Sequence, residues 1–236
     1  MSRAGNTTFY QRHGKRAIDL VLSLLLVALF WWVLAAVAVL VRLKLGSPVL
    51  FRQPRPGRDE RIFSLYKFRT MTDERGEDGE LLPDEARLTR FGKALRATSL
   101  DELPEVFNII RGEMAIIGPR PQLVRDMVFM TPEQRRRHVV RPGLSGLAQV
   151  SGRNGIPWDD KLSYDLEYIE RVTLAGDAAI FFRTVAEAFV KREGITGEDM
   201  ATAADYGDWL LAEGRVTPGE YDALQLRARR LLEDAR

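Results

Sequence analysis

The sequence predicts an α+β fold in three parts, and three observations support it. A long apolar segment lies near the N-terminus, short strand-like runs separated by proline- and glycine-rich turns follow it, and helical patterns occupy most of the remainder. We expect an N-terminal membrane re-entrant helix within residues 1–45. We also expect a compact, mostly helical domain with a few short strands and interfacial amphipathic helices over 46–192, and a C-terminal helical hairpin over 193–236.

The charge balance narrows the choice of partners. The 35 basic and 33 acidic residues give a formal net charge of +2. Residues 193–236 hold ten acids and five bases, so the rest of the chain holds 30 bases and 23 acids, a net of +7. A basic body suits a phosphorylated ligand, an anionic membrane surface or nucleic acid. The absence of cysteine excludes disulfides and thiolate nucleophiles, and two histidines disfavour a multi-histidine metal centre.

Residues 17–41, AIDLVLSLLLVALFWWVLAAVAVLV, form a membrane segment whose only charge is Asp19. As a helix this segment is about 37 Å long, enough to cross the hydrocarbon core. A cleaved signal peptide is disfavoured because the run is too long and no small-residue cleavage site follows it. A buried helix of a soluble protein is the remaining alternative, and the apolar residues on every face of the helix oppose it.

The flanks of this segment bear on whether it spans the membrane or re-enters on one side. Basic residues precede and follow it: Arg3, Arg12, Lys15 and Arg16, then Arg42, Lys44, Arg52, Arg55 and Arg58. Basic flanks prefer the cytoplasmic side. A simple span would put one of the two basic clusters on the other side, whereas a re-entrant helix keeps both on the cytoplasmic side. Re-entry needs a bend, which proline usually provides, and this segment has none. The two topologies remain close, with the flanks favouring re-entry and Trp31-Trp32 as the unusual pair near the middle.

Two strands and a helix are expected after the membrane segment. Residues 49–52 and 61–68 read as strands around a proline- and glycine-rich turn. Residues 73–83 are polar and charged, which is typical of a surface loop. Residues 89–97 form a short helix with its basic side chains on the exposed sides.

The stretch SLDELPEVFNIIRGEMAIIGPRP, residues 99–121, places two carboxylates beside each other. Ser99 and Glu102 have the spacing of a capping box, and either Ser99 or Asp101 could cap the following helix, so that Asp101 lies at a helix N-terminus. An apolar helix over 106–110 and a buried strand over 114–117 should follow. The strand ends at a turn in which two prolines stiffen the backbone around Arg120.

The C-terminal part combines a glycine-punctuated loop with helices. The loop covers residues 141–154, and a helix is expected over 158–171. Residues 178–192 form an amphipathic, aromatic helix that either belongs to the core or lies on the bilayer. The extension contains two short helices around a start signal at Thr217-Pro218. Three roles remain open for this extension: oligomerisation, docking of a partner, or none, as a solvated appendage. Oligomerisation would include a homodimer.

The pair Asp101-Glu102 admits two interpretations. Helix capping is the ordinary one. The other is a reactive pair aimed at a phosphate, because four basic residues from separate segments can converge there: Lys67, Arg69, Arg96 and Arg120. Guanidinium groups and helix amides bind phosphate oxygens, and a carboxylate can hold Mg²⁺. A carboxylate can also attack phosphorus and form an aspartyl phosphate.

Three motifs resemble a known family. KFRTM at 67–71, SLDELPEVFNIIRGEMAIIGPRP at 99–121 and RPGLSGLAQVSGRN at 141–154 occur in the order seen in bacterial sugar transferases. These are the monotopic phosphoglycosyl transferases, which begin glycoconjugate assembly. The resemblance covers residues 11–192 and leaves the C-terminal extension outside.

The resemblance implies a two-step transfer. A uridine-diphosphate (UDP) sugar would be the donor, and the family's nucleophilic aspartate corresponds to Asp101. This carboxylate would attack the sugar-bearing phosphorus, expel UMP and carry the phosphosugar covalently. A polyprenol phosphate, undecaprenyl phosphate in most bacteria, would then take the phosphosugar and become a polyprenol-diphosphate sugar.

The resemblance also implies roles for the other motif residues. Glu102 would ligate Mg²⁺, which neutralises the diphosphate. Lys67 and Arg96 match basic positions near the phosphates, and Arg120 with Pro121 matches the motif associated with the nucleotide. The remaining matches lie in a loop that would shape the sugar site or a lid: Gln149, Gly152, Arg153 and Asn154.

The resemblance further implies a location. The family's re-entrant helix is broken at a Ser-Pro pair, and Trp31-Trp32 stands in that place here. The catalytic domain would face the cytoplasm on the bacterial inner membrane, at the height of the polyprenol phosphate and in contact with membrane lipid. Nucleic acid is not an expected partner, because no helix has a basic face interleaved with stacking aromatics.

Overall fold

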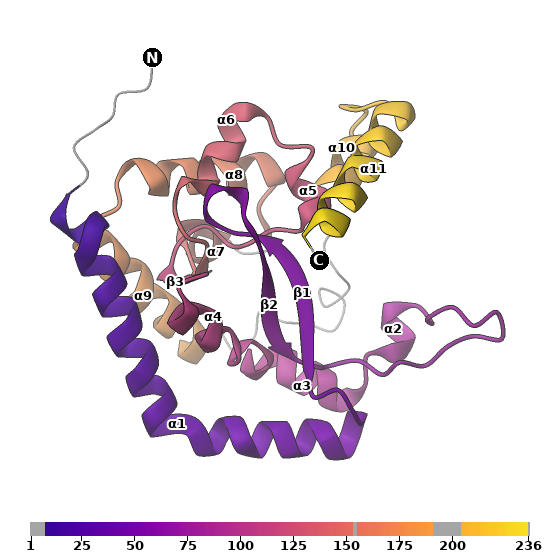
Figure 1. Cartoon of the computed structure of the whole chain (residues 1–236), viewed down its shortest axis with the longest axis horizontal. Coiled ribbons are helices and arrows are strands. Elements are labelled where there is room, and N and C mark those ends of the chain that lie inside the picture. Colours follow the sequence, from indigo (N-terminus) through magenta and orange to yellow (C-terminus); the bar gives the residue numbers. More distant parts are fainter. Residues whose placement is uncertain (1–7, 153–154, 191–203, 236) are drawn as a thin grey trace.

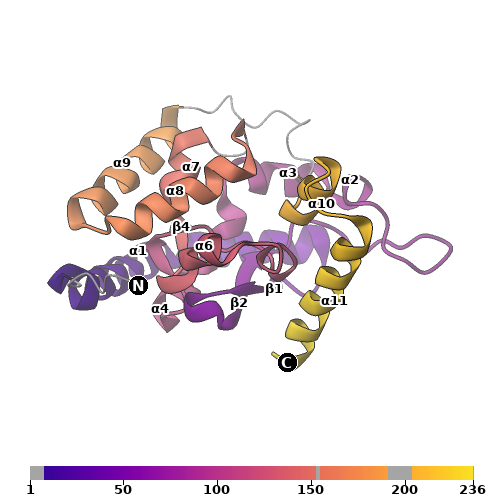
Figure 2. The same ribbon diagram turned by 90° about the horizontal axis from the view of Figure 1, so that it is seen from above.

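The structure, a computed structural model, describes residues 8–152, 155–190 and 204–235. A long bent helix, α1, borders the molecule, and the β1–β2 hairpin crosses its middle (Figure 1). Helices α7, α8 and α9 form a layer on one side, and the C-terminal helices α10 and α11 lie at the end remote from the start of α1 (Figure 2). The arrangement agrees with the predicted α+β class.

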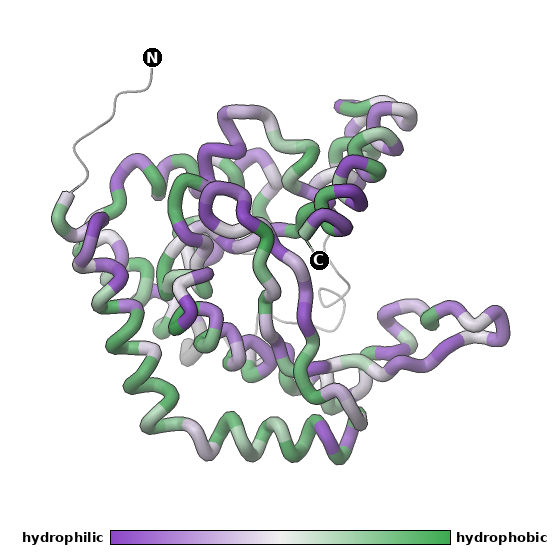
Figure 3. Tube along the Cα trace, viewed as in Figure 1, coloured by the Kyte–Doolittle hydropathy of each residue, from purple (hydrophilic) through white to green (hydrophobic). Residues whose placement is uncertain are grey.

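The apolar segment forms helix α1, Lys15–Leu45, which continues directly from the π-helical turn η1, Tyr10–Gly14. In Figure 3, which is coloured by hydropathy, α1 is hydrophobic along most of its length and hydrophilic near its ends. At Phe30 the backbone leaves the helical region, with φ −120° and ψ 17°, and the helix bends there (Figure 1). We call residues 15–29 the first arm and residues 31–45 the second arm.

The bend occurs without proline, and Trp32 supplies a physical reason. A break in a helix leaves a backbone carbonyl without its amide partner, which is costly in an apolar environment. The indole Nε1 of Trp32 donates a hydrogen bond to the carbonyl oxygen of Leu29 at 3.1 Å. A side chain that enters the backbone ladder is one of the known causes of a helix kink. The tryptophan pair therefore does lie at the bend.

Polar contacts attach the first arm to the body. Arg16 donates to the carbonyl oxygens of Ile109 and Ile110, at 2.5 and 2.8 Å. Asp19, only 5% exposed, accepts a hydrogen bond from the backbone amide of Ile116. The basic flank that predicts a cytoplasmic end therefore also fixes the angle at which the helix leaves the body.

Apolar contacts attach the second arm. Val37, Val41 and Leu45 are buried against Phe68 and Leu95 of the body. Both arms thus contact the same body, one through hydrogen bonds and one through a hydrophobic core.

Strands β1, Leu50–Pro56, and β2, Ile62–Phe68, form an antiparallel hairpin in which Leu50 pairs with Phe68 and Pro56 with Ile62. The predicted second strand matches β2, whereas β1 runs four residues beyond its predicted end and includes Pro54 and Pro56. Proline is tolerated because each strand of a two-stranded sheet has one edge that needs no amide donors. The hairpin delivers its last residues toward α3 and the second arm of α1.

Helix α3, Arg90–Ala97, lies where the sequence predicts it, and Thr89 caps it by accepting from the amide of Gly92. A Cβ at Gly92 would lie 1.8 Å from the carbonyl oxygen of Thr70, so only glycine allows this close approach of α3 to the end of β2. The predicted polar loop protrudes from the body together with α2, Asp84–Arg87 (Figure 1).

A second small sheet holds the turn around Arg120. Strand β3, Ala115–Ile117, pairs in parallel with β4, Gly143–Ser145. Three short helical elements connect them: α5, Val124–Met127, α6, Pro132–Arg135, and the 3₁₀ helix η4, Arg136–Val139. The expectation of a plain loop over 141–154 is wrong, because this stretch contains β4 and α7, Leu147–Gly152.

Helices α8, Trp158–Glu170, and α9, Leu174–Val190, pack beside this sheet. The amphipathic helix α9 has a buried face with Ile180 and an exposed apolar face with Phe181 and Phe182, which are 40% and 68% exposed. The sequence left this segment open between core packing and contact with the bilayer. The face with Ile180 packs in the core. The face with Phe181 and Phe182 is exposed, so the bilayer alternative stays a prediction.

The C-terminal extension forms α10, Tyr206–Ala212, and α11, Pro218–Asp234, which starts at Thr217 with a capping box as the sequence predicts. The extension is packed on α5. Tyr206, Leu210 and Ala228 are buried in one core with Val124 and Met127. A fully solvated appendage is therefore excluded for the described part of the extension.

The fit of α10 against the body is tight at one glycine. A Cβ added to Gly207 would lie 2.5 Å from the ring of the buried Phe129. We expect Gly207→Ala to lower the free energy of unfolding by about 1–3 kcal/mol, the usual cost of overpacking. Thermal or denaturant unfolding of the purified protein measures it. Gly219→Ala on α11, whose Cβ would meet nothing within 4 Å, is the matched control and should not destabilise. Equal losses for both substitutions would contradict the close fit.

Candidate active site

Three separate segments meet at the carboxylate of Glu102. Its Oε1 accepts from Nζ of Lys67 on β2 at 2.6 Å and from an Nη of Arg120, in the turn after β3, at 2.7 Å. Burial by itself would raise the pKa of Glu102, but Arg120 and Lys67 outweigh it and hold the pKa well below its ordinary value. Glu102 is therefore an anion that gathers two cations at one point.

Asp101 lies beside this cluster on a short 3₁₀ helix, η3, Leu100–Glu102, and is 8% exposed. Burial, followed by the neighbouring charge of Glu102, raises the pKa of Asp101, while Lys67 and Arg96 act in the opposite direction. A buried carboxylate with basic neighbours is the combination that favours a reactive role over a solvated one.

The predicted capping box is wrong. Ser99 has a left-handed backbone, with φ 54° and ψ 18°, and its side chain makes no capping hydrogen bond. Glu102 bonds to Lys67 and Arg120. The α-helix α4, Glu105–Arg111, begins only after Pro104, so Asp101 precedes it on a separate turn. Glu102 thus pairs with two cations, and neither η3 nor α4 has a side-chain capping hydrogen bond, which opposes the capping interpretation of the pair.

Glu105 is a third carboxylate that the sequence analysis did not single out. It is 2% exposed and lies 3.4 Å from Nζ of Lys67. Burial, followed by the charge of Glu102, raises the pKa of Glu105 to about 7. The signal was present as the Glu102–Glu105 spacing of three residues, which places both carboxylates on one side of a helical turn.

The turn with Arg120 and Pro121 is held from both sides by guanidinium groups. Arg137 donates to the carbonyl oxygen of Arg120 at 2.6 Å, and Arg55 donates to that of Pro121 at 3.0 Å. Arg137 in turn pairs with Asp165, and both side chains are almost fully buried. The backbone of the turn is thus fixed, whereas the side chain of Arg120 remains 41% exposed and accessible to a ligand.

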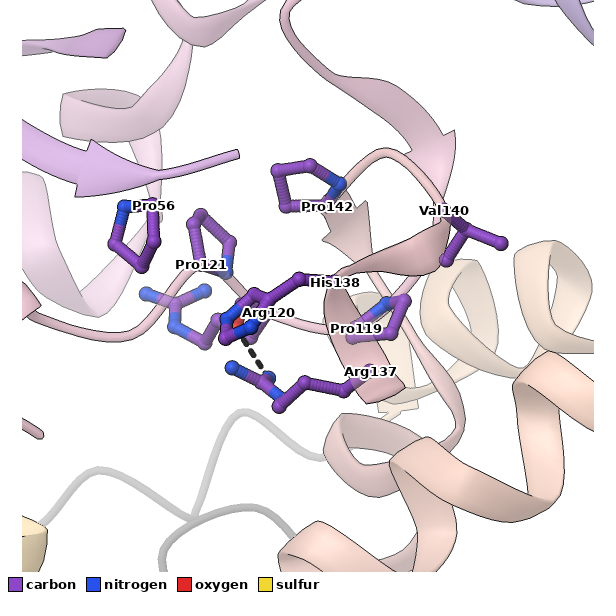
Figure 4. Close-up of a pocket in the computed structure, with 8 residues that line it drawn as sticks. All are labelled: Pro56, Pro119, Arg120, Pro121, Arg137, His138, Val140 and Pro142. Atoms are coloured by element: carbon purple, nitrogen blue, oxygen red, sulfur yellow. Dashed lines mark hydrogen bonds between the residues drawn. The ribbon is translucent and has the colours of Figure 1, made fainter. Parts of the chain in front are cut away.

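Figure 4 shows this turn inside a small pocket lined by prolines and by Arg137, with the Arg137–Arg120 hydrogen bond drawn as a dashed line. Burial, followed by the charge of Arg137, lowers the pKa of His138 in this pocket to about 4, so His138 is neutral at neutral pH. Burial, followed by the charge of Arg120, lowers the pKa of Arg55 to about 10. Neither Arg55 nor Arg137 was among the predicted site residues, because their roles depend on the folded position of the turn.

The remaining predicted residues divide into three groups. Arg96 belongs to the cluster, since its charge acts on Asp101 and its Nε donates to Thr70. Arg69 instead binds the carbonyl oxygens of Ser47 and Met71 and pairs with Asp73, so it ties loops together. Gln149 on α7 donates to the carbonyl oxygen of Leu144 in β4. The predicted Arg153 and Asn154 lie outside the described residues.

The site lies beside the second arm of α1. Leu100 and Leu103, which flank the two carboxylates, pack with Val37 and Val41 of that arm in one hydrophobic cluster. The residues that position Asp101 therefore contact the most apolar helix of the molecule.

The carboxylates limit how a metal ion can be held. Among the described residues, no group of three or more His, Asp and Glu side chains is arranged as a metal cage. Mg²⁺ commonly binds through one or two carboxylates and completes its coordination with substrate phosphates and water. Both cations that pair with Glu102 bind its Oε1, so Glu102 fits such a single-carboxylate site through its second oxygen.

Comparison with known proteins identifies the chain's relatives. The profile of the family described as bacterial sugar transferase matches residues 10–191. The chain is 43% identical over 189 residues to an uncharacterized sugar transferase, EpsL, of Bacillus subtilis (strain 168), and the match covers 80% of this chain and 93% of that protein.

Two further relatives have named activities. A UDP-glucose:undecaprenyl-phosphate glucose-1-phosphate transferase of Caulobacter vibrioides is 39% identical, over 72% of this chain and 68% of that protein. A UDP-N-acetylgalactosamine-undecaprenyl-phosphate N-acetylgalactosaminephosphotransferase of Aeromonas hydrophila is 37% identical, over 72% of this chain. The matched region spans only 42% of the Aeromonas protein. The matched family profile covers most of this chain, including every element of the site, and the chain therefore belongs to the bacterial sugar transferase family.

Proposed function

We propose that this chain transfers a sugar-1-phosphate from a UDP-sugar to a polyprenol phosphate, with undecaprenyl phosphate as the expected lipid, and releases UMP. The activities for which the relatives are named support the two substrate classes. Because these relatives differ in the sugar that they name, the proposal concerns the UDP-sugar class. The observation that carries it is the buried Asp101 whose charge interacts with those of Lys67, Arg96 and Arg120. Its neighbours Leu100 and Leu103 pack against the apolar second arm.

In the first step, a carboxylate oxygen of Asp101 attacks the sugar-bearing phosphorus and forms an acyl phosphate. The bond from that phosphorus to the bridging oxygen breaks, and UMP leaves with the bridging oxygen and its electron pair. Arg120 and Lys67 are placed to attract the diphosphate, because both already bind a carboxylate oxygen at the same point. Burial strips water from Asp101, which leaves its oxygen free to act as a nucleophile.

In the second step, an oxygen of the polyprenol phosphate attacks the same phosphorus, and the Asp101 carboxylate leaves. The product is the polyprenol-diphosphate sugar, and the enzyme returns to its starting state. No proton is gained or lost by the enzyme over the two steps, so the site needs fixed charges more than a general base. The packing of Leu100 and Leu103 on α1 supports delivery of a lipid-bound phosphate to Asp101.

We also propose that Glu102 ligates Mg²⁺ with the substrate diphosphate. The ion would neutralise phosphate charge and so lower the repulsion that an anionic nucleophile meets. Lys67 and Arg120 supply part of the same neutralisation from the protein.

For the membrane arrangement, we propose a re-entrant α1 with the body on the cytoplasmic face of the inner membrane. Each arm has 15 residues and is about 22 Å long, which is shorter than the roughly 30 Å of the hydrocarbon core. Both arms also contact one body, through Arg16 and Asp19 on the first arm and Val41 on the second. A straight span would place the two sets of contacts on opposite sides of the bilayer.

Asp101→Asn tests the covalent route. An amide cannot form the acyl phosphate, so we expect UMP release to fall by roughly 10³-fold or more, as for the loss of other enzyme nucleophiles. Protein incubated with UDP-sugar and Mg²⁺, without polyprenol phosphate, should gain the mass of a sugar-phosphate in the unsubstituted chain and none in the variant. The exposed Asp160→Asn is the control and should keep both the adduct and UMP release. Turnover without any adduct would refute the covalent intermediate.

Trp32→Phe tests the bend. Single cysteines introduced at Ser2 and Ser47 should both escape an impermeant thiol reagent in intact cells if α1 is re-entrant. Loss of the indole donor to Leu29 removes a hydrogen bond worth about 1 kcal/mol, so labelling at position 2 should rise several-fold in the Trp32→Phe background. The neighbouring Trp31→Phe is the matched control and should leave position 2 protected. Labelling at position 2 in the unsubstituted background would show a span.

The titration of Glu105 predicts how stability depends on pH. Its pKa is about 7 in the folded protein and near 4.5 in the unfolded chain, so the folded state binds more protons between these values. Stability should therefore fall as pH rises through this window, by up to about 3 kcal/mol. Glu105→Gln should remove this part of the slope in melting temperatures measured from pH 5 to pH 8, whereas the exposed Glu85→Gln should not. Parallel slopes for the unsubstituted chain and Glu105→Gln would contradict the raised pKa.

A further inference from the structure

A second group of cations surrounds an open cavity of about 420 Å³ at the start of α1. Its lining comprises Gln11, Arg12, His13, Arg16, Arg58 and Arg141, and we call it the arginine cavity. Four guanidinium groups and one imidazole face it, and no carboxylate belongs to the lining. Its volume lies in the range of small-molecule binding sites.

Two of these arginines are held in place by neutral groups. Arg16 donates to the carbonyl oxygens of Ile109 and Ile110, and Arg141 donates to that of Gly112 at 2.7 Å. These carbonyls form the C-terminal end of α4, where the helix dipole favours cations. Among the described residues, neither Arg16 nor Arg141 forms an ion pair with a carboxylate. Their positions are therefore fixed by carbonyl groups, and Asp19, the carboxylate whose charge acts on both, makes no ion pair with either.

The crowding of like charge has a measurable consequence. Burial, followed by the charges of Arg16 and Arg58, lowers the pKa of Arg141. Arg58 reaches Asp59 only at 3.5 Å, and both side chains of this pair are more than half exposed, so the pair is weakly held. In the active site, by contrast, Lys67 and Arg120 are neutralised by Glu102. An anion from outside the protein would relieve the repulsion in the arginine cavity.

The height of the cavity along α1 indicates the kind of anion. Val21, Leu22 and Leu25 of the first arm are 43–55% exposed, so the lipid-facing surface starts about 7.5 Å beyond Arg16, at a rise of 1.5 Å per residue. A lipid whose acyl chains lie against these residues has its headgroup at the level of residues 11–16. Phe9, which is 79% exposed, adds an apolar contact next to the cavity.

The geometry points to a binding site for the phosphate of an anionic phospholipid headgroup in the arginine cavity. Guanidinium groups bind phosphate oxygens in pairs, and basic pockets beside membrane helices suit anionic headgroups. The site is separate from the active site, whose Leu100 and Leu103 pack on the second arm, whereas the cavity adjoins the start of the first arm. A bound lipid would fix the first arm in the bilayer without taking part in transfer.

Native mass spectrometry of the full-length protein in a neutral detergent tests this proposal with three added probes: short-chain phosphatidylglycerol, short-chain phosphatidylcholine and inorganic phosphate. The unsubstituted protein should retain phosphatidylglycerol in preference to phosphatidylcholine, and equimolar phosphate should not displace it. The double variant Arg12→Gln/Arg58→Gln should bind phosphatidylglycerol at least ten-fold more weakly, because charge-assisted hydrogen bonds are lost. The control Arg229→Gln/Arg230→Gln, on the exposed side of α11, removes the same charge and should not change binding.

Three results would overturn the proposal. These are equal retention of the two lipids, equal weakening by the control pair, and displacement by phosphate, which would indicate a site for a soluble anion.

UMP release in detergent without phospholipid separates this site from the proposed transferase activity. The cavity variant should release UMP at the unsubstituted rate, and a loss would show that the cavity belongs to the catalytic site.

Discussion

The interaction on which the site depends is the double contact of Glu102 with Lys67 and Arg120. One carboxylate oxygen joins the β1–β2 hairpin, the turn η3 and the turn after β3, which are otherwise separate in sequence. The attraction is strong because the group is largely withdrawn from water, and charges interact more strongly inside a protein than in water. Asp101 lies next to Glu102 on η3, and among the described residues its carboxylate forms no ion pair, although the charges of Lys67 and Arg96 act on it.

The bend in α1 sets which part of the helix lies beside the candidate site. A helix of this length and composition would cross a bilayer if it were straight, and its interruption at Phe30 returns the second arm to the body. Leu100 and Leu103 then pack against that arm and place the carboxylates beside the apolar surface. The hydrogen bonds of Arg16 and Asp19 fix the first arm on the body, so the angle of the helix relative to the candidate site is set from both arms.

The C-terminal hairpin, formed by α10 and α11, supports the site through its packing on α5. Arg125 on α5 pairs with Asp205 and Asp208, and the buried Asp126 accepts from the amide of Tyr206. Helix α5 directly follows Arg120-Pro121, so the hairpin braces the segment that leads out of this turn. The family match ends at residue 191, before the hairpin, yet the described hairpin residues share a core with the matched body.

The long apolar helix, β2, α3 and the start of α11 could be predicted from the sequence, because they depend on local pattern, and the family could be predicted from motifs contiguous in the chain. The sequence did not determine the bend at Phe30, strand β4 or the roles of Glu105, Arg55 and Arg137. The bend is accompanied by one indole hydrogen bond, and β4 exists only through pairing with β3. Likewise, a guanidinium such as that of Arg69 could bind a phosphate or a backbone carbonyl, and only the folded chain shows that it takes the carbonyls of Ser47 and Met71. Charge and hydrophobicity are properties of the residues, whereas the partner of each charge is set by distances that exist only after folding.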